Sequence, residues 1–195
     1  TSCPAIPAYV TKSLKISLPE LPATSFKWDL MKTSYDYSAV GDAENAVAEL
    51  LRYCGQANEI DYTTTGSAAS LKINVMINTF GYSKNMRSLY RGNYTDSHWE
   101  SLIYEELSNQ RPVLYCGNAD PDSSIKEGHQ FICDGYDGNG KFHINWGWGG
   151  RCDGYYLLSA CNPEDEGKPN GFKFNIDQLA ITGFKPAKEG EVEIP

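Results

Sequence analysis

The pattern of apolar and polar positions divides the chain into a helix-rich part and a strand-rich part. Three segments repeat apolar residues every three or four positions, which is the spacing of an amphipathic helix. The first is residues 42–55, with inward positions Ala43, Val47, Leu50, Leu51 and Cys54. The second is residues 69–80, with inward positions Leu71, Val75, Met76 and Phe80. The third starts at Thr95, with inward positions Trp99, Leu102, Ile103 and Leu107. Asp42 is expected to cap the first helix, and Gly55 and Gly81 are expected to end the first and the second.

After Pro112 the pattern changes to that of short strands. Six runs are rich in β-branched and aromatic residues and are separated by Gly and Asp turns: VLYCG, HQFICDGY, KFHINW, GYYLLSA, FKFNI and LAITGF. The DGNG sequence at 137–140 predicts a tight hairpin, because Asn-Gly readily adopts the positive φ values of such turns. Residues 1–26 contain four prolines and are expected to be extended. Because helices precede an antiparallel sheet, the predicted fold class is α+β.

Composition excludes several classes of function. The formal net charge of -8 argues against nucleic-acid binding, which needs clustered Lys and Arg. No apolar run approaches the ~18 residues that cross a bilayer, so no membrane partner is expected. The three histidines do not have metal-ligand spacing and no phosphate-loop motif occurs, so neither a metal nor a cofactor is expected.

The six cysteines do not form an obvious disulfide framework or a CxxC pair. Cys54, Cys116 and Cys133 lie among apolar neighbours and are expected to behave as small hydrophobic residues. Cys152 and Cys161 are close enough in sequence either to pair or to stay free. Cysteine usage therefore leaves the redox compartment open.

The candidate chemistry lies around the DGNG hairpin, in the stretch GHQFICDGYDGNGKFHINWGWGG. His129 starts the strand before the turn, and Asn145 lies near the end of the strand after it. Antiparallel pairing makes the two residues near neighbours, with a modest register offset that a β-bulge absorbs. Trp146 follows Asn145 directly and can shield a bond between them.

Such a pair suits general-base catalysis. An imidazole base needs a partner that fixes its orientation and tautomer, and an amide oxygen serves when the nucleophile is a cysteine thiol. The alternatives stay open at this point, because a single histidine is more often structural and NWGWGG alone also suits an aromatic corner or a glycan-binding shelf. His98 and His143 are interpreted as structural residues.

These motifs resemble a known family. The segments GHQFICDGY, FHINWGWGG and DGYYLLSACNP are similar to the streptopain family of bacterial secreted cysteine proteases, which includes interpain. Further similarity runs through FKWDLM at 26–31, AVAELLRYCG at 46–55 and ITGFKP at 181–186, so it covers nearly the whole chain. The resemblance implies a papain-like fold, with a helical half and a β half.

The resemblance also implies roles for individual residues. His129 would be the catalytic base, Asn145 its orienting partner and Trp146 the shielding indole, while Gly128 and Trp148 would contact substrate. The family cleaves proteins, favours an apolar residue two positions before the scissile bond and is made as a zymogen. A secreted cysteine endopeptidase with a protein or peptide substrate is therefore expected.

The chain departs from the family at the nucleophile. The family's cysteine lies in a motif like TGCVATA at the start of a long helix, whereas Cys3 is followed by Pro4 and Pro7. Residues 1–195 are therefore expected to form a single papain-like domain without the nucleophile helix, and an N-terminal segment, a separate chain or a propeptide is the expected partner. Cys3 and Cys133 are weaker candidates for the nucleophile, because neither starts a helix.

Two non-catalytic functions remain as alternatives. The cleft and its tryptophans could hold a peptide or partner without turnover, or the chain could dock as an inhibitory or regulatory subunit on an active protease. A reactive thiol within reach of His129 is the feature that separates them from an enzyme.

Overall fold

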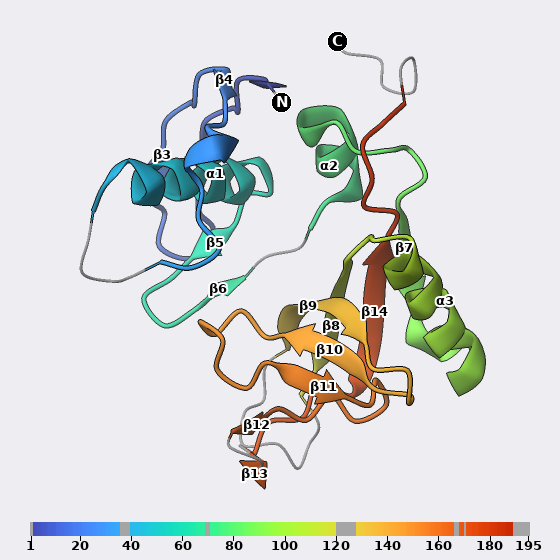
Figure 1. Ribbon diagram of the computed structural model, residues 1–195. Coiled ribbons are helices and arrows are strands. Elements are labelled where there is room, and N and C mark those ends of the chain that lie inside the picture. The colour runs from blue at the N-terminus through green and yellow to red at the C-terminus, as the bar shows by residue number, and fades with distance from the viewer. Residues whose placement is uncertain are drawn as a thin grey trace. The chain divides into compact units, whose positions relative to one another are not determined.

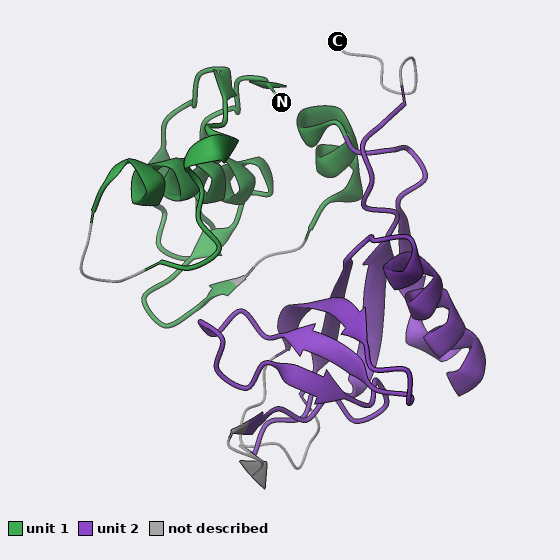
Figure 2. Cartoon of the chain, in the orientation of Figure 1, with its two compact units in different colours: residues 1–81, 192–195 green, residues 82–191 purple. Residues whose placement is uncertain are grey.

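A computed structural model describes residues 2–35, 40–68, 71–119, 128–165, 168–169 and 171–188. The chain forms two compact units that meet in sequence between Gly81 and Tyr82 (Figure 2). Helices lie in both units, and unit 2 is built on an antiparallel sheet (Figure 1). The fold is therefore α+β, as the sequence predicts. The single domain over residues 1–195 stays a prediction.

Unit 1 is built around α1, which spans Asp42–Ala57. The predicted helix is confirmed and starts at Asp42 as expected, but the predicted cap residue and the predicted C-terminal end were wrong. Gly41 is the N-cap, and its amide donates to Glu44 Oε2 at 3.0 Å. The helix continues past Gly55 to Ala57. A Cβ at Gly55 would lie 2.0 Å from the Tyr62 hydroxyl, so this glycine makes room for a close contact and does not end the helix.

The proline-rich start of unit 1 is extended, as predicted. Its short strands pair as two antiparallel ribbons: β1 (Ser2–Cys3) with β4 (Thr24–Ser25), and β2 (Tyr9–Val10) with β3 (Ser17–Leu18). The buried side chain of Gln56 in α1 donates to the carbonyls of Pro7 and Pro19, at 3.0 and 2.8 Å. One helix residue therefore holds the two segments that connect the ribbons, and its side-chain amide supplies a donor for two backbone carbonyls.

The remaining elements of unit 1 are short. They are η1 (Trp28–Leu30), β5 (Asp61–Tyr62), β6 (Ser67–Ala68) and α2 (Ile73–Phe80). The second predicted helix starts later than expected, and its predicted residues 69 and 70 lie outside the described part. Gly81 ends it in the left-handed conformation, as predicted, with φ 71°. None of the α2 residues is fully buried.

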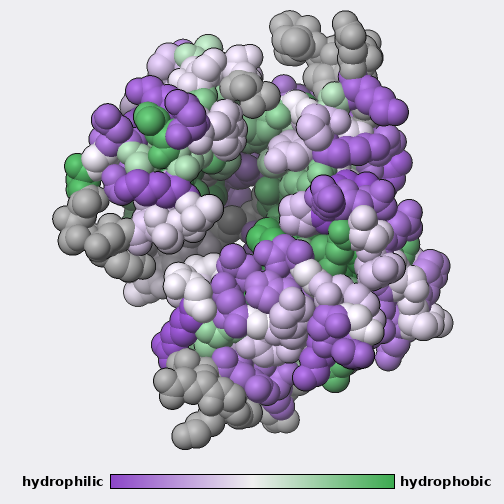
Figure 3. Space-filling view, in the orientation of Figure 1, coloured by the Kyte–Doolittle hydropathy of each residue, from purple (hydrophilic) through white to green (hydrophobic). Residues whose placement is uncertain are grey.

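Unit 2 contains a six-stranded antiparallel sheet in the order β11-β10-β9-β8-β14-β7 (Figure 1). Its strands are β7 (Arg87–Tyr90), β8 (Val113–Asn118), β9 (His129–Tyr136), β10 (Phe142–Asn145), β11 (Gly154–Tyr156) and β14 (Ile176–Thr182). The unit also contains the strand pair β12 (Glu164–Asp165) and β13 (Lys168–Pro169) and the 3-10 helix η2 (Arg91–Asn93). Hydrophilic residues cover most of its visible face (Figure 3).

Two strand predictions need correction. FKFNI was expected to be a strand, but only Ile176 of that run belongs to one, because Phe172 and Phe174 pack into the core from irregular chain. β7 has the sequence RSLY, of which only Leu89 packs inward, so its pattern is too short to predict a strand.

Helix α3 (Asp96–Ser108) packs against the sheet, and its N-cap is Thr95, the predicted starting residue. Its Trp99 and Ile103 are completely buried. The Trp99 indole donates to the Tyr115 hydroxyl at 2.8 Å, and that hydroxyl donates to Gln178 Oε1 at 3.0 Å. Gln178 Nε2 donates in turn to the Leu158 carbonyl at 2.7 Å, so a buried polar chain joins α3, β8 and β14.

Candidate active site

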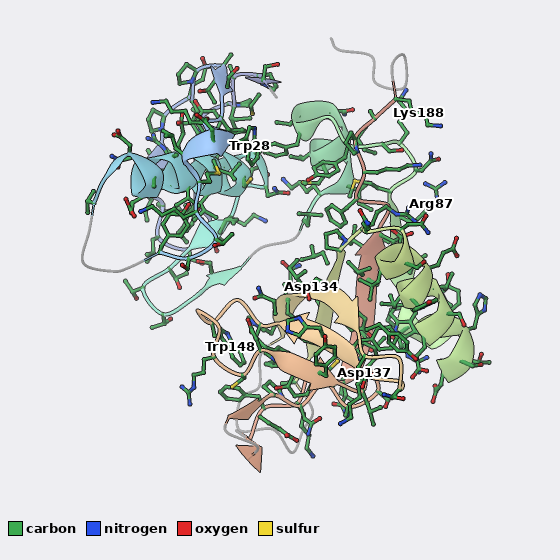
Figure 4. The ribbon with its side chains drawn as sticks, viewed as in Figure 1. Trp28, Arg87, Asp134, Asp137, Trp148 and Lys188 are labelled. Atoms are coloured by element: carbon green, nitrogen blue, oxygen red, sulfur yellow. The ribbon has the colours of Figure 1, made fainter. Side chains whose placement is uncertain are left out.

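The site is built on the hairpin of β9 and β10. The Asp137 carboxylate closes its turn by accepting the amides of Asn139 and Lys141, at 2.7 and 3.0 Å. Figure 4 shows Asp137 and Trp148 at opposite ends of this hairpin. The predicted hairpin is thus confirmed, and the candidate residues lie at the end away from its turn.

A one-residue bulge is present, as the sequence predicts, but it does not bring Asn145 opposite His129. His143 pairs with Gly135 but Ile144 pairs with Cys133, which leaves Asp134 as the extra residue. Side chains alternate along a strand, so this shift places Asn145 opposite Ile132. His129 lies on the other face, because it shares the parity of Cys133.

The imidazole of His129 has a defined tautomer. Its Nε2 lies 2.8 Å from the Trp146 carbonyl oxygen. A carbonyl can only accept, so Nε2 carries the proton and donates it, which leaves the lone pair on Nδ1 free to take a proton. Burial lowers the pKa of His129 below its ordinary value, and the bond to the Trp146 carbonyl opposes that effect in part. The ring is therefore a neutral base near pH 7.

Aromatic rings hold the imidazole in place. Trp148 stacks on His129 with ring centroids 4.9 Å apart and the planes 26° apart. The rings of Phe174 and Phe131 follow at 5.3 and 6.1 Å, and the fully buried indole of Trp146 at 6.4 Å. These neighbours keep water from much of the ring and cause the lowered pKa.

Asn145 reaches His129 through one peptide group. Its Oδ1 accepts the Gly147 amide at 2.9 Å, and that amide belongs to the same peptide group as the Trp146 carbonyl. A direct hydrogen bond between His129 and Asn145 does not occur among the described residues. The predicted pairing across the strands is therefore wrong: Asn145 pairs with Ile132, and it is connected to the imidazole only through the Trp146–Gly147 peptide group. Hydrogen bonds in such a series polarise one another.

Two glycines shape the chain beside His129. A Cβ on Gly117, the β8 residue that pairs with His129, would lie 2.1 Å from the Phe174 carbonyl oxygen. A Cβ on Gly128 would lie 2.7 Å from Asn118 Oδ1. Gly128 itself is exposed, and Trp148 is half-buried.

The six cysteines are free thiols, so Cys152 and Cys161 do not pair. Burial raises the pKa of Cys3 to about 11 and that of Cys161 to about 12. Burial also raises the pKa values of Cys54, Cys116 and Cys133. Such thiols are poor nucleophiles near pH 7, because the thiolate is the reactive form.

The other two histidines have structural surroundings. His143 Nδ1 lies 2.6 Å from Asp134 Oδ1, and His98 stands against the edge of the Tyr94 ring. Among the described residues no group of three or more His, Cys, Asp or Glu side chains is arranged to hold a metal. In the same part of the chain, every helix is too short or too polar to cross a membrane.

Sequence reasoning missed two groups that contact this site. One is the Trp146 carbonyl, a backbone group that every residue has and that the sequence therefore cannot single out. The other is Asp153, whose Oδ1 accepts the Trp146 amide at 2.9 Å. In the sequence DGYY, Asp153 has the appearance of an ordinary turn residue.

Comparison with known proteins identifies the family. Residues 4–156 match the model of the Peptidase C10 family. The chain belongs to the Peptidase C10 family.

Two curated relatives support the membership of this family. The chain is 34% identical over 164 residues to streptopain of Streptococcus pyogenes serotype M1, which covers 83% of the chain but only 40% of the streptopain. It is 31% identical over 166 residues, 84% of the chain and 18% of the relative, to the thiol protease/hemagglutinin PrtT of Porphyromonas gingivalis. The chain thus spans less than half the length of the curated relatives it matches.

The solved structures concern interpain A of Prevotella intermedia. The active wild-type cysteine protease matches with a TM-score of 0.80 and 28% identity, over 93% of this chain and 74% of that one. A prointerpain A fragment matches with a TM-score of 0.72 and 28% identity, over 95% and 58%. The expected resemblance to streptopain and interpain is confirmed.

Proposed function

We propose that this chain carries the base half of the active site of a cysteine endopeptidase, with His129 as the general base. One observation supports this above all: Nε2 of His129 donates to the Trp146 carbonyl, which leaves Nδ1 as the basic atom. Membership of a cysteine-peptidase family gives that base a thiol to serve. The nucleophilic thiol comes from outside the six cysteines of residues 1–195, whose pKa values, where shifted, are raised and not lowered.

The proposed reaction has two halves. Nδ1 of His129 takes the thiol proton, and the thiolate attacks the carbonyl carbon of the scissile peptide bond. The imidazolium then gives that proton to the leaving amine, and a thioester remains. Water hydrolyses the thioester with Nδ1 again acting as base. Throughout, Nε2–H stays on the Trp146 carbonyl, so the ring keeps one orientation in both protonation states.

The other predicted site residues have supporting roles in this proposal. Asn145 fixes the Trp146–Gly147 peptide, and the Trp146 indole excludes water from beneath the imidazole. Gly128 gives a bound peptide close access to backbone, and Trp148 offers it an apolar surface. We propose further that the enzyme acts on proteins and is made with a propeptide, as the name of the prointerpain relative suggests. We also propose that it is a secreted bacterial enzyme, as its resemblance to the streptopain family implies.

Labelling of the full-length protein tests the proposal. The wild-type protein and its His129→Gln variant are each treated with a thiol-directed epoxide of the kind that modifies papain-like enzymes. The modified residue is mapped by peptide mass spectrometry, and peptide hydrolysis is assayed in parallel. We expect label on one cysteine outside residues 1–195, and we expect His129→Gln to abolish labelling and hydrolysis.

Two outcomes would contradict the proposal in different ways. Label on Cys3 or another of the six cysteines would place the nucleophile on this chain. Absence of both labelling and hydrolysis in the wild-type protein would favour the peptide-binding alternative. His98→Gln is the matched control, since this exposed histidine lies outside the site and its loss should leave labelling unchanged.

A further inference from the structure

The turn after β10 is held by side chains on both sides of Trp146. Asp153 Oδ1 accepts the Trp146 amide at 2.9 Å, and Asn145 Oδ1 accepts the Gly147 amide at 2.9 Å. The first bond fixes the peptide group before Trp146 and the second fixes the one after it. The carbonyl of that second peptide group is the acceptor for His129 Nε2.

This turn is costly to order without such bonds. Four of its residues have left-handed backbone, with φ values of 75° at Gly147, 68° at Gly149, 89° at Gly150 and 64° at Cys152. Glycines lose more conformational freedom on ordering than other residues do. A carboxylate that accepts a backbone amide forms one of the stronger hydrogen bonds of proteins, so Asp153 is well suited to select one conformation of the turn.

We propose that Asp153 is a positioning residue for His129. It acts through the backbone of Trp146, because its carboxylate holds the amide of the residue whose carbonyl sets the imidazole tautomer. Without that bond the carbonyl moves relative to Nε2, and the proton is free to occupy either ring nitrogen. The catalytic consequence rests on the proposed function of His129, but the effect on the tautomer does not.

The chain offers a matched control for this carboxylate. Asp137 also accepts backbone amides in a turn, the one that joins β9 and β10, at 2.7 Å from Asn139 N and 3.0 Å from Lys141 N. It lies at the end of the hairpin away from Trp148 (Figure 4). Asp137→Ala therefore removes a comparable turn contact without touching the support of His129.

The first experiment measures which ring nitrogen of His129 carries the proton. The full-length protein is labelled with ¹⁵N-histidine, and the NMR signals of the ring nitrogens are recorded at a pH where the ring is neutral. The His129 signals are assigned by their absence in His129→Gln. We expect one protonated and one unprotonated nitrogen in the wild-type protein. Asp153→Ala should give nitrogen shifts averaged between the two tautomers, whereas Asp153→Asn, which keeps an oxygen acceptor, and Asp137→Ala should resemble the wild type.

The second experiment measures catalysis. We expect Asp153→Ala to lower kcat by about 10- to 100-fold with little change in KM, because a displaced base affects the chemical step more than substrate binding. Asp153→Asn should restore most of kcat. A folded Asp153→Ala protein with the wild-type tautomer would overturn the proposal, as would equal shifts in Asp137→Ala. Since the tautomer is read without substrate, an inactive wild-type protein would overturn only the proposed function.

Discussion

At the scale of single residues, His129 is held as a neutral ring by burial. Its aromatic neighbours exclude water from the imidazole and lower its pKa below the ordinary value. Protonation is therefore more favourable in the unfolded chain than in the folded one. The contribution of His129 to the free energy of unfolding should be constant above the unfolded pKa, about 6.5, and should fall as the pH drops below it.

Comparison with a variant isolates the contribution of His129. We expect His129→Gln to lose less stability than the wild-type protein between pH 7.5 and pH 5, because glutamine has no proton to gain in that range. Urea denaturation of both proteins at the two pH values measures the difference. Equal losses would show that the pKa of His129 is the same in the folded and unfolded states.

Tyr115 is a second residue with a measurable role. Its hydroxyl accepts from Trp99 Nε1 and donates to Gln178 Oε1, and all three side chains are buried. Tyr115→Phe leaves both partners unpaired, which should reduce the free energy of unfolding by about 1–3 kcal/mol. Chemical denaturation of the variant and the wild type measures this loss in the free energy of unfolding. Tyr104→Phe is the control, because Tyr104 is 50% exposed and such a change should stay within about 0.5 kcal/mol.

The hairpin that carries the candidate residues could be predicted from sequence, but not the contacts between those residues. The turn signal predicts that the strands of His129 and Asn145 pair, whereas the observed register places Asn145 opposite Ile132. The Trp146 carbonyl and the Asp153 carboxylate depend on the path of a glycine-rich turn. Glycine permits so many backbone conformations that its sequence does not determine that path.

At the scale of elements, β8 and β9 fix the position of His129 through Gly117. A Cβ at Gly117 would lie 2.1 Å from the Phe174 carbonyl oxygen, which is backbone and cannot rotate away. Gly117→Ala should therefore lower the free energy of unfolding by about 1–3 kcal/mol, through strain of the kind that overpacking causes. Thermal and urea denaturation measure the loss.

The control for Gly117 is another glycine with space around it. A Cβ on Gly66 would have no heavy atom within 4 Å, so Gly66→Ala should leave stability within about 0.5 kcal/mol of the wild type. Since Gly117 pairs with His129, its alanine variant should also shift the ring signals of His129. A stable Gly117→Ala protein with unshifted signals would show that the Phe174 segment moves freely.

Helices were easier to predict than their ends. Periodicity identified α1 and α3 because many residues contribute to it, whereas an end depends on one or two. Gly55 follows an apolar period, which predicts a helix end, but it lies within α1. The residue there is glycine because the hydroxyl of Tyr62 takes the space of a side chain. Such a tertiary contact overrides local propensity and cannot be read from neighbouring letters.

At the scale of the whole molecule, the six thiols form a set without an obvious reactive member. Cys3, Cys133, Cys152 and Cys161 are buried, and Cys54 and Cys116 are half-buried. We expect residues 1–195 to titrate with a thiol reagent as six thiols in denaturant and much more slowly in the native state at pH 7. Fewer than six in denaturant, without reductant, would reveal a disulfide. One fast native thiol would be a candidate nucleophile on this chain.

The fold class was predictable because it depends on order along the chain. Helical periods precede strand periods, and that order alone indicates α+β. The division into two units at Gly81 and Tyr82 was not predicted, because the sequence there has no linker composition. Contacts distant in sequence define each unit, and local patterns do not report them.

The hydrogen bond of His129 to a main-chain carbonyl limits which substitutions can remove it. A substitution at position 146 exchanges the indole but leaves the carbonyl in place, so no single codon can delete this acceptor. Mutation reaches it only indirectly, through Asn145, Gly147 and Asp153, which set the direction in which it points. Substitutions can therefore disturb the hydrogen bond of His129 only by moving this carbonyl. If His129 acts as the base, as proposed, we expect inactivating changes at Asn145, Gly147 and Asp153.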